Sequence, residues 1–254
     1  MDNALTVTNL QKIYGSRANI TTALDDVSFD VADGDFVGIM GPSGSGKTTL
    51  LNCISTIDTV TAGHVIIGGD DVTRLKGDAL ARFRREKLGF IFQDFNLLDT
   101  LTGFENIALA LTISGVGTVE IDERVRRAAT HLGISDVLGK FPYQMSGGER
   151  QRVASARAIV SDPTLVLADE PTGALDSKSA RVLLESFERL NTELGATILL
   201  VTHDPFAASY CRRILFIKDG RLFSEITRDG VDRKEFFGRI MEVVTLLGGD
   251  TDAR

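Results

Sequence analysis

A glycine-rich run near the start of the chain restricts its possible folds more than any other feature. It reads Gly41-Pro42-Ser43-Gly44-Ser45-Gly46-Lys47-Thr48 and follows a short apolar segment at residues 35–40. Two glycines separated by four residues and followed by Lys-Thr match the phosphate-binding P-loop pattern. Such a loop joins a strand to a helix, so we expect a strand at 35–40 and a helix with Leu50, Leu51 and Ile54 on one face.

The residue types of this loop suit the binding of phosphate groups. Glycines let backbone N–H groups surround phosphate oxygens, and the following helix directs the positive end of its dipole at them. Lys47 is expected to place a charge on the outer phosphates, and the Thr48 hydroxyl to be a ligand for Mg²⁺. The alternative is an ordinary glycine-rich turn, but the position between a predicted strand and a predicted helix favours phosphate binding.

Two carboxylates end a second apolar segment. Residues 165–168 predict a buried strand, which Asp169 and Glu170 follow. In an open parallel sheet, ligands gather at the carboxyl ends of the strands, so both acids are expected at the phosphate site. Asp169 is expected to hold Mg²⁺, and Glu170 to orient and polarise an attacking water. Taken alone, a strand that ends in Asp-Glu is more often a solvated strand end, and the P-loop upstream favours the functional interpretation.

His203 follows a third apolar strand, predicted at residues 197–202. A lone histidine is more often structural than catalytic. Because this histidine follows the carboxyl end of a strand, we expect it to contact the terminal phosphate of the ligand.

The remaining pattern predicts parallel βαβ units interrupted by a helical region. Further strands are expected at residues 5–8, 24–31, 64–67 and 88–92. Helices are expected at residues 105–111, 121–132, 150–160, 180–190 and 234–247. We find no repeat and no linker, so we expect one domain at 1–254 with a helical part at about 94–160.

Composition and charge weigh against several classes of protein. The chain has 28 Lys+Arg against 35 Asp+Glu and a net charge of -7, so it lacks the excess of basic residues typical of nucleic-acid binding. No apolar run is long enough to span a bilayer, and residues 1–5 lack the features of a signal peptide. Cys53 and Cys211 are the only cysteines, which fits a reducing cytoplasm. We expect a soluble intracellular protein.

A second candidate phosphate site lies at residues 145–152, the signature segment. It reads Met145-Ser146-Gly147-Gly148-Glu149-Arg150-Gln151-Arg152. Ser146 is a plausible N-cap of the helix that follows, and the two glycines leave N–H groups exposed at its end. The alternative is an ordinary capped turn.

With this segment the chain resembles the ABC ATPase family over almost its full length. The usual family signature is Leu-Ser-Gly-Gly-Gln, from which this chain departs at Met145 and Glu149. Tyr14 matches the aromatic residue that stacks on adenine, and Gln93 matches the glutamine that touches Mg²⁺ and senses the membrane partner. His203 matches the switch histidine of the family.

The loop Gly173-Ala174-Leu175-Asp176 matches the dimer-contact loop of the family, with glycine where many relatives carry serine. The resemblance implies a head-to-tail homodimer. In such a dimer each ATP is expected to lie between the P-loop of one subunit and Ser146-Gly147-Gly148 of the other. The resemblance also implies that Thr49 binds the nucleotide.

The resemblance also implies the fold and the activity. It implies an α/β fold of the P-loop NTPase class, with a RecA-like parallel sheet core, an antiparallel β subdomain and an inserted helical subdomain. ATP and Mg²⁺ are the expected cofactors, with Thr48, Gln93 and Asp169 at the metal. The expected activity is ATP hydrolysis at the cytoplasmic face of the cell membrane, which powers a separate integral-membrane permease and involves no nucleic acid.

Within the family the chain is similar to the macrolide-export, lipoprotein-release and cell-division branch (MacB, LolD and FtsE types). The likeness is greatest to ATPases of bacitracin-type antimicrobial-peptide resistance transporters. The likeness to the branch is carried by residues 90–93, 95–98 and 168–173, and the likeness to the bacitracin-type ATPases by residues 96–102, 173–180, 203–205, 208–211 and 232–237.

Two other functions within the branch remain alternatives: a regulatory ATPase of the cell-division type and a lipoprotein-release ATPase. A DNA clamp or a ribosome-binding member predicts a long coiled-coil insertion or a second cassette, and the chain shows neither. Phe95, Leu97, Leu98 and Leu101 form either a groove for a permease helix or the core of the helical part.

Overall fold

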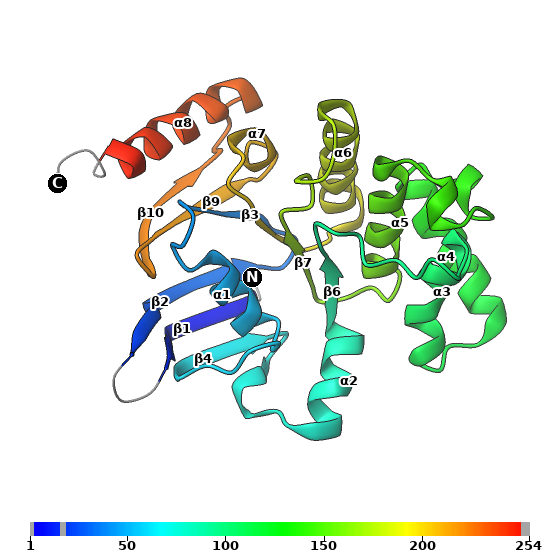
Figure 1. The fold of residues 1–254 in the computed structure, drawn as a ribbon, viewed down its shortest axis with the longest axis horizontal. Helices are drawn as coiled ribbons and strands as arrows, with labels where there is room; N and C mark the ends of the chain where they lie inside the picture. Colours follow the sequence, from blue (N-terminus) through cyan, green and yellow to red (C-terminus); the bar gives the residue numbers. More distant parts are fainter. Residues whose placement is uncertain (1–2, 16–18, 250–254) are drawn as a thin grey trace.

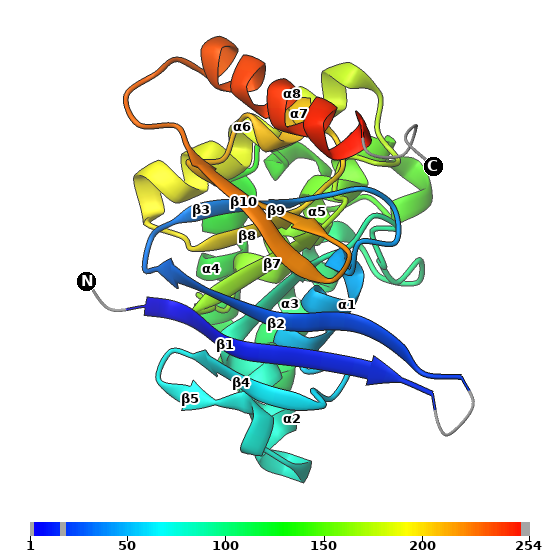
Figure 2. The ribbon, with the colours of Figure 1, turned by 90° about the vertical axis from the view of Figure 1, so that its left-hand side faces the viewer.

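The computed structural model describes residues 3–15 and 19–249, which form two sheets with helices around them (Figure 1, Figure 2). The smaller sheet is antiparallel and has the strand order β2-β1-β4-β5. Its strands are β1 (Asn3–Tyr14), β2 (Thr21–Ala32), β4 (Ala62–Ile67) and β5 (Asp70–Asp71). The β1 strand pairs with β2 along its length and ends at Tyr14.

The larger sheet has the order β10-β9-β3-β8-β7-β6 and is parallel except for its edge strand β10. Its strands are β3 (Phe36–Met40), β6 (Leu88–Ile91), β7 (Leu165–Asp169), β8 (Ile198–Val201), β9 (Arg213–Lys218) and β10 (Arg221–Thr227). Every residue of β3 and β8 is buried. Continuous burial is expected of central parallel strands, because both faces of such a sheet are covered.

Helices cover the larger sheet and form a separate group at one side (Figure 1). The α-helices of the described residues are α1 (Lys47–Ile54), α2 (Gly77–Lys87), α3 (Gly103–Ile113), α4 (Thr118–His131), α5 (Gly147–Ile159), α6 (Ser177–Leu194), α7 (Pro205–Ala208) and α8 (Arg233–Gly249). Short 3₁₀ turns lie at Val72–Arg74, Ser135–Val137 and Pro142–Gln144. The group at one side consists of α3, α4 and α5. None of the described helices is long and apolar enough to cross a membrane.

Two apolar clusters lie on the two faces of the parallel sheet. In β8, Leu199 and Val201 belong to the cluster with α1 and the antiparallel sheet, whereas Ile198 and Leu200 belong to the cluster with α6 and the helical group. Neighbouring side chains of a strand point to opposite faces, which explains this division. Because β3, β6, β7, β8 and β9 are parallel, their carboxyl ends lie at one edge of the sheet.

Most predicted elements agree with the structure. The predicted strand at 35–40 is β3, and the five apolar positions of the 121–132 pattern are buried: Ile121, Val125, Ala128, Ala129 and Leu132. The sequence did not predict α2, β9 or β10. In α2 only Phe83 is buried, and β10 is an edge strand whose residues are all exposed or partly exposed, so neither carries a periodic apolar pattern.

Candidate active site

The P-loop follows β3 and opens α1, and its backbone requires glycine at two points. Gly41 and Gly46 have φ angles of 158° and 105°. A Cβ at Gly41 would lie 2.1 Å from the Ile217 carbonyl oxygen, and a Cβ at Gly46 would lie 2.6 Å from the Ala23 carbonyl oxygen. Larger residues are therefore excluded by contact as well as by conformation.

The loop presents unpaired polar groups, as a phosphate site requires. Gly46 is the N-cap of α1 and provides no side-chain acceptor for the first N–H groups of the helix. The Ser45 hydroxyl is buried and has no hydrogen-bond partner among the described residues. Buried polar groups are almost always paired, so an anionic group at this loop would satisfy donors that the protein leaves open.

Lys47 begins α1 and is nearly buried, with 9% of its surface exposed. Its ammonium group donates to the carbonyl oxygens of Gly41 at 2.8 Å and Pro42 at 2.9 Å. Burial lowers the pKa of Lys47, and the nearby carboxylates of Glu170 and Asp169 act in the opposite direction. The charge is thus held over the loop by neutral acceptors, where phosphate oxygens would be stronger partners.

The two carboxylates lie where the sequence predicted, at the end of β7. Burial and the neighbouring Glu170 raise the pKa of Asp169, while Lys47 opposes this shift. The strands β3 and β7 both pair with β8 in parallel, so Lys47 and the two carboxylates follow strands that end at the same edge of the sheet. Thr48 lies in the first turn of α1 and is exposed to solvent, so its hydroxyl is accessible to a ligand. Thr49 follows it in the same turn and is partly buried.

Glu170 is held in one orientation by residues at the end of β8. One carboxylate oxygen accepts the Thr202 hydroxyl at 3.1 Å, and the other accepts the His203 backbone N–H at 3.0 Å. The His203 ring nitrogen Nδ1 lies 2.8 Å from the same oxygen as the N–H. Glu170 also has a positive φ of 45°, a conformation that is uncommon for a residue with a side chain and costs about 1 kcal/mol or more.

Thr202 is a site residue that the sequence did not identify. It is fully buried, and its hydroxyl both donates to Glu170 and accepts from the Asp204 N–H at 3.0 Å. A threonine at the end of an apolar strand has no distinctive pattern, because threonine is common in strands.

Gln93 follows β6 and lies against the loop after β7. A Cβ at Gly173 would lie 2.9 Å from the Gln93 side-chain carbon Cδ and 3.1 Å from its nitrogen Nε2. The glycine therefore gives the amide group space that a serine would occupy. The residue before Gln93 is held from α5, because Gln151 donates to the Phe92 carbonyl oxygen at 3.0 Å.

The signature segment begins α5 with a capping box. The Ser146 N–H donates to a Glu149 carboxylate oxygen at 2.6 Å, and the Glu149 N–H donates to the Ser146 hydroxyl oxygen at 3.3 Å. These bonds lower the pKa of Glu149. Glu149 therefore has a structural role that the sequence left open: it fixes the end of the helix that carries Gly147 and Gly148.

The structure does not bring together the two segments of one chain that the sequence predicts to bind phosphate. Figure 1 shows α1, which begins at the P-loop, and α5, which begins at the signature segment, well apart. Gly148 instead packs on α6, where its added Cβ would lie 2.9 Å from the Ser179 Cβ.

Tyr14, the predicted adenine platform, ends β1 with 40% of its surface exposed. Its hydroxyl donates to Asp58 at 2.8 Å. Burial and this bond raise the pKa of Tyr14, and a hydrogen bond with the Thr49 side chain opposes the shift. Because the Asp58 N–H donates to the Asn52 carbonyl oxygen of α1, the bond to Asp58 ties the tyrosine to the helix of the P-loop.

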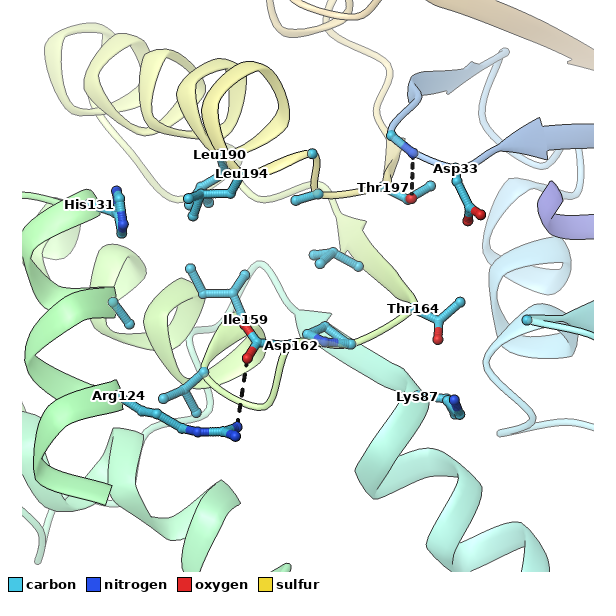
Figure 3. A pocket seen from close by; sticks show the side chains of 18 of the residues that line it. Asp33, Lys87, Arg124, His131, Ile159, Asp162, Thr164, Leu190, Leu194 and Thr197 are labelled. Carbon is cyan, nitrogen blue, oxygen red and sulfur yellow. Dashed lines mark hydrogen bonds and ion pairs between the residues drawn. The ribbon is translucent and has the colours of Figure 1, made fainter. Parts of the chain in front are cut away.

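A cavity of about 780 Å³ lies at the other edge of the parallel sheet (Figure 3). Lys87, Gly34 and Thr197 line it, and they precede β6, β3 and β8. Arg124 reaches toward Asp162 across 3.7 Å in this cavity. Since the P-loop and the carboxylates follow the strands, the cavity is separate from the candidate active site.

Fold and site together define a nucleotide-binding protein of the P-loop α/β class. The family model described as ABC transporter matches residues 24–173. The chain belongs to the ABC transporter family, and within it to the ATP-binding proteins. This confirms the predicted family, the fold class and the assignment of the chain as an ATPase.

Two curated relatives cover nearly the whole chain. The ABC transporter ATP-binding protein YxdL of Bacillus subtilis is 50% identical over 252 residues, which are 99% of this chain and 97% of the relative. The bacitracin export ATP-binding protein BceA of Halalkalibacterium halodurans is 49% identical over 245 residues, 96% of this chain and 97% of the relative.

A similar solved structure is a dimer of the ATP-binding cassette MJ0796, a protein of Methanocaldococcus jannaschii, in a post-hydrolysis state bound to ADP and Pi. Its TM-score is 0.80 at 39% sequence identity, and the match covers 89% of this chain and 99% of that chain. The fold described above is thus that of an ATP-binding cassette.

Proposed function

We propose that this chain is the ATP-hydrolysing subunit of a transporter, works as a homodimer and drives a separate integral-membrane permease in resistance to bacitracin-like peptides. One observation carries the proposal: two phosphate-binding helix ends, on α1 and α5, lie apart in a single chain. Two copies arranged head to tail supply both ends to one ATP. The relative named for bacitracin export, at 49% identity, supports the substrate class.

The P-loop side of the site binds the phosphates. The start of α1, which has no side-chain cap, lies at the same loop as the unpaired Ser45 hydroxyl and the Lys47 ammonium. This side of the site is completed by the remaining loop residues and the first turn of α1: Gly41, Pro42, Ser43, Gly44, Thr48 and Thr49. On the opposite side of the nucleotide, Ser146, Gly147 and Gly148 of the second subunit present the end of α5 to the γ-phosphate. Negative charge that develops on the γ-phosphate oxygens is then stabilised from two directions.

Glu170 is the proposed general base. It accepts a proton from water as the water oxygen bonds to the γ-phosphorus, and the bond to the bridging oxygen breaks to leave ADP and inorganic phosphate. Thr202 and His203 hold its carboxylate in a fixed orientation. His203, with 74% of its side chain exposed, also has room to contact the γ-phosphate.

Thr48, Gln93 and Asp169 are the proposed ligands of Mg²⁺, which neutralises phosphate charge when bound. Hydroxyl, amide and carboxylate oxygens suit this hard cation. The described residues contain no group of three or more His, Cys, Asp or Glu able to hold a metal. Mg²⁺ commonly has few protein ligands and completes its shell with phosphate oxygens and water, so this donor set fits.

The permease is proposed to dock beside Gln93, on Phe95, Leu97, Leu98 and Leu101. Leu98 is 47% exposed, and Phe95 contacts the signature helix through Arg150, whose guanidinium carbon lies 5.1 Å from the ring centroid. Docking there links the permease to both halves of the ATP site. We propose residues 94–160 as the helical subdomain that carries this surface, within a single ABC ATPase domain at 1–254, whose ends lie outside the described residues. This docking places the chain at the cytoplasmic face of the membrane as a peripheral protein.

The chain, reconstituted with its permease in liposomes, tests the proposal. We expect bacitracin to stimulate ATP turnover when the permease is present, and the Lys47→Ala variant to show no turnover. Turnover that depends on the permease but responds to no peptide antibiotic would contradict the substrate class. Turnover indifferent to the permease would contradict the role as a transporter motor.

A further inference from the structure

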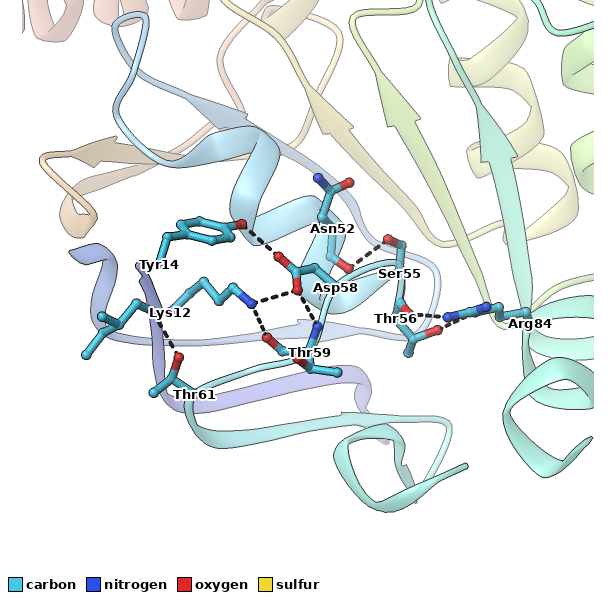
Figure 4. A network of polar contacts seen from close by, with 10 residues as sticks. Lys12, Tyr14, Asn52, Ser55, Thr56, Asp58, Thr59, Thr61 and Arg84 are labelled. Carbon is cyan, nitrogen blue, oxygen red and sulfur yellow. Dashed lines mark hydrogen bonds and ion pairs between the residues drawn. The ribbon is translucent and has the colours of Figure 1, made fainter. Parts of the chain in front are cut away.

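We propose that Lys12 and Asp58 are positioning residues that hold the Tyr14 ring as a one-sided platform for the adenine base. The inference rests on the proposed nucleotide site and extends it to two residues that no motif identifies. Figure 4 shows the network: Lys12 and Tyr14 reach from β1 toward Asp58 in the segment after α1.

Asp58 binds both residues of β1 at once. One carboxylate oxygen accepts the Tyr14 hydroxyl at 2.8 Å, and the other accepts the Lys12 ammonium at 2.6 Å. The second oxygen also accepts the Thr59 N–H at 2.7 Å. The carboxylate is therefore fixed from three directions and defines where the tyrosine hydroxyl lies.

Lys12 covers one face of the ring. Its ammonium lies 4.7 Å from the Tyr14 ring centroid, and it also donates to the Thr59 carbonyl oxygen at 2.6 Å. Lys12 is 7% exposed, whereas Tyr14 is 40% exposed. A cation on one face is attracted by the ring quadrupole and leaves the other face as the open surface on which a base can stack.

The network ties the ring to the helix of the P-loop. The Asp58 N–H donates to the Asn52 carbonyl oxygen in α1 at 3.0 Å, and the Ile13 N–H donates to the Thr61 hydroxyl at 2.9 Å. Since α1 begins at Lys47, these bonds fix the position of the ring relative to the phosphate loop. An ordered platform loses less conformational freedom when the base binds than a mobile one does.

A purely structural role for the Lys12–Asp58 pair makes a different prediction. A pair that only joins β1 to the segment after α1 would affect the binding of every ligand through stability. A pair that positions the ring affects only ligands that carry a base. ATP and inorganic tripolyphosphate separate the two roles, because both present three phosphates and only ATP has adenine.

The experiment measures dissociation constants of ATP and of tripolyphosphate by titration calorimetry on the full chain without Mg²⁺. Tyr14→Ala is expected to weaken ATP binding about tenfold, as loss of base stacking does, and to leave tripolyphosphate binding unchanged. Asp58→Asn and Lys12→Met are expected to weaken ATP binding about threefold to fivefold, again without effect on tripolyphosphate. In the Tyr14→Ala background, Asp58→Asn should cause no further loss.

Two further variants serve as controls. Tyr14→Phe removes the bond to Asp58 but keeps the ion pair between Lys12 and Asp58, so it tests positioning where folding is not in question; ATP binding should weaken about twofold to threefold. Asp71→Asn removes a paired aspartate in β5 of the antiparallel sheet, the partner of His64 and Arg74, and should leave ATP binding unchanged.

The outcomes distinguish the inference from the function on which it rests. If Tyr14→Ala binds ATP normally, the assignment of Tyr14 as the adenine platform is wrong. The P-loop assignment is unaffected by that result, because Lys47→Ala tests it separately. If Tyr14→Ala weakens ATP binding but Tyr14→Phe and Asp58→Asn do not, the positioning role is overturned. Equal losses for ATP and tripolyphosphate in Asp58→Asn also overturn it.

Discussion

Glu149 allows a sharp test of the signature segment, because the chain carries glutamate where the family usually carries glutamine. Glu149→Ala removes the acceptor of the Ser146 N–H bond at 2.6 Å and the Lys140 contact at 3.5 Å. Glu149→Gln keeps a side-chain oxygen at the same place and loses only the ion pair. The two variants thus separate the capping bond from the charge.

The structure sets the size of each effect. Loss of a helix N-terminal cap costs about 1 kcal/mol, and an exposed ion pair contributes about 0–1 kcal/mol. The Lys140 side chain is 42% exposed, so its contribution lies at the lower end. A loss of 1 kcal/mol lowers the melting temperature of a chain of this size by roughly 2–4 °C. We expect that shift for Glu149→Ala and a change below about 1 °C for Glu149→Gln.

The assays are thermal unfolding, ATP binding and steady-state ATP hydrolysis. Glu149→Ala should lower turnover several-fold, because a frayed α5 no longer presents Ser146 and the following N–H groups in a fixed direction. ATP binding to the single chain should not change, since the P-loop is untouched. Equal damage from both substitutions would refute the capping argument, and so would full activity and stability in Glu149→Ala.

The pKa shift of Glu149 adds a pH dependence to the same test. Hydrogen bonds from Ser146 lower the pKa of Glu149 from its ordinary value of 4.5. A lowered folded-state pKa means that the carboxylate stabilises the fold fully above pH 4.5, and that this contribution is lost as pH falls through the lowered value. The stability difference between wild type and Glu149→Ala should therefore shrink in acid below that pH.

Three further substitutions test the hydrolytic end of the site. Thr202→Val removes a hydrogen bond to Glu170 and should lower kcat about tenfold with little change in KM for ATP. Comparable changes in kcat and KM would contradict this prediction. Gly173→Ser places a Cβ 2.9 Å from the Gln93 side chain and should displace that flexible amide. We expect reduced permease-stimulated turnover with an unchanged melting temperature. Unchanged stimulation would count against a role for this contact. Glu170→Gln should bind ATP without hydrolysis and sediment as a stable dimer, whereas unchanged turnover would remove Glu170 from its role.

Much of the fold was predictable from the sequence because the pattern and the local rules agree. Five apolar positions of α4 and its C-cap residue, from Ile121 to Leu132, recur on one face, and all five are buried. The strand β3 is short, apolar and followed by the P-loop, which leaves one interpretation. Such elements need no knowledge of their neighbours to be identified.

The elements that were missed depend on tertiary context. The β9 strand has four buried residues between charged ends, and a run of that length is ambiguous between strand and helix. The α2 helix buries Phe83 only, so no apolar period marks it. Its position beside β6 becomes apparent only when the sheet is assembled.

The same contrast applies to the site. Lys47, Asp169 and Glu170 were predictable because their motifs are local in the sequence. The anchors Thr202 and Asp58 were not, because each acts on a residue that is distant along the chain: Glu170 is 32 positions from Thr202, and Tyr14 is 44 positions from Asp58. Contacts of this kind follow from the fold and have no sequence signature of their own.

The most direct test of the account is the dependence of ATP turnover per chain on protein concentration. A site shared between two copies loses activity on dilution, because dissociation separates the α5 end of one subunit from the P-loop of the other. We predict that turnover per chain falls toward zero as the protein is diluted at saturating ATP and Mg²⁺, and recovers on concentration. Constant turnover per chain down to the lowest concentration, with the protein monomeric by sedimentation, would contradict the shared site.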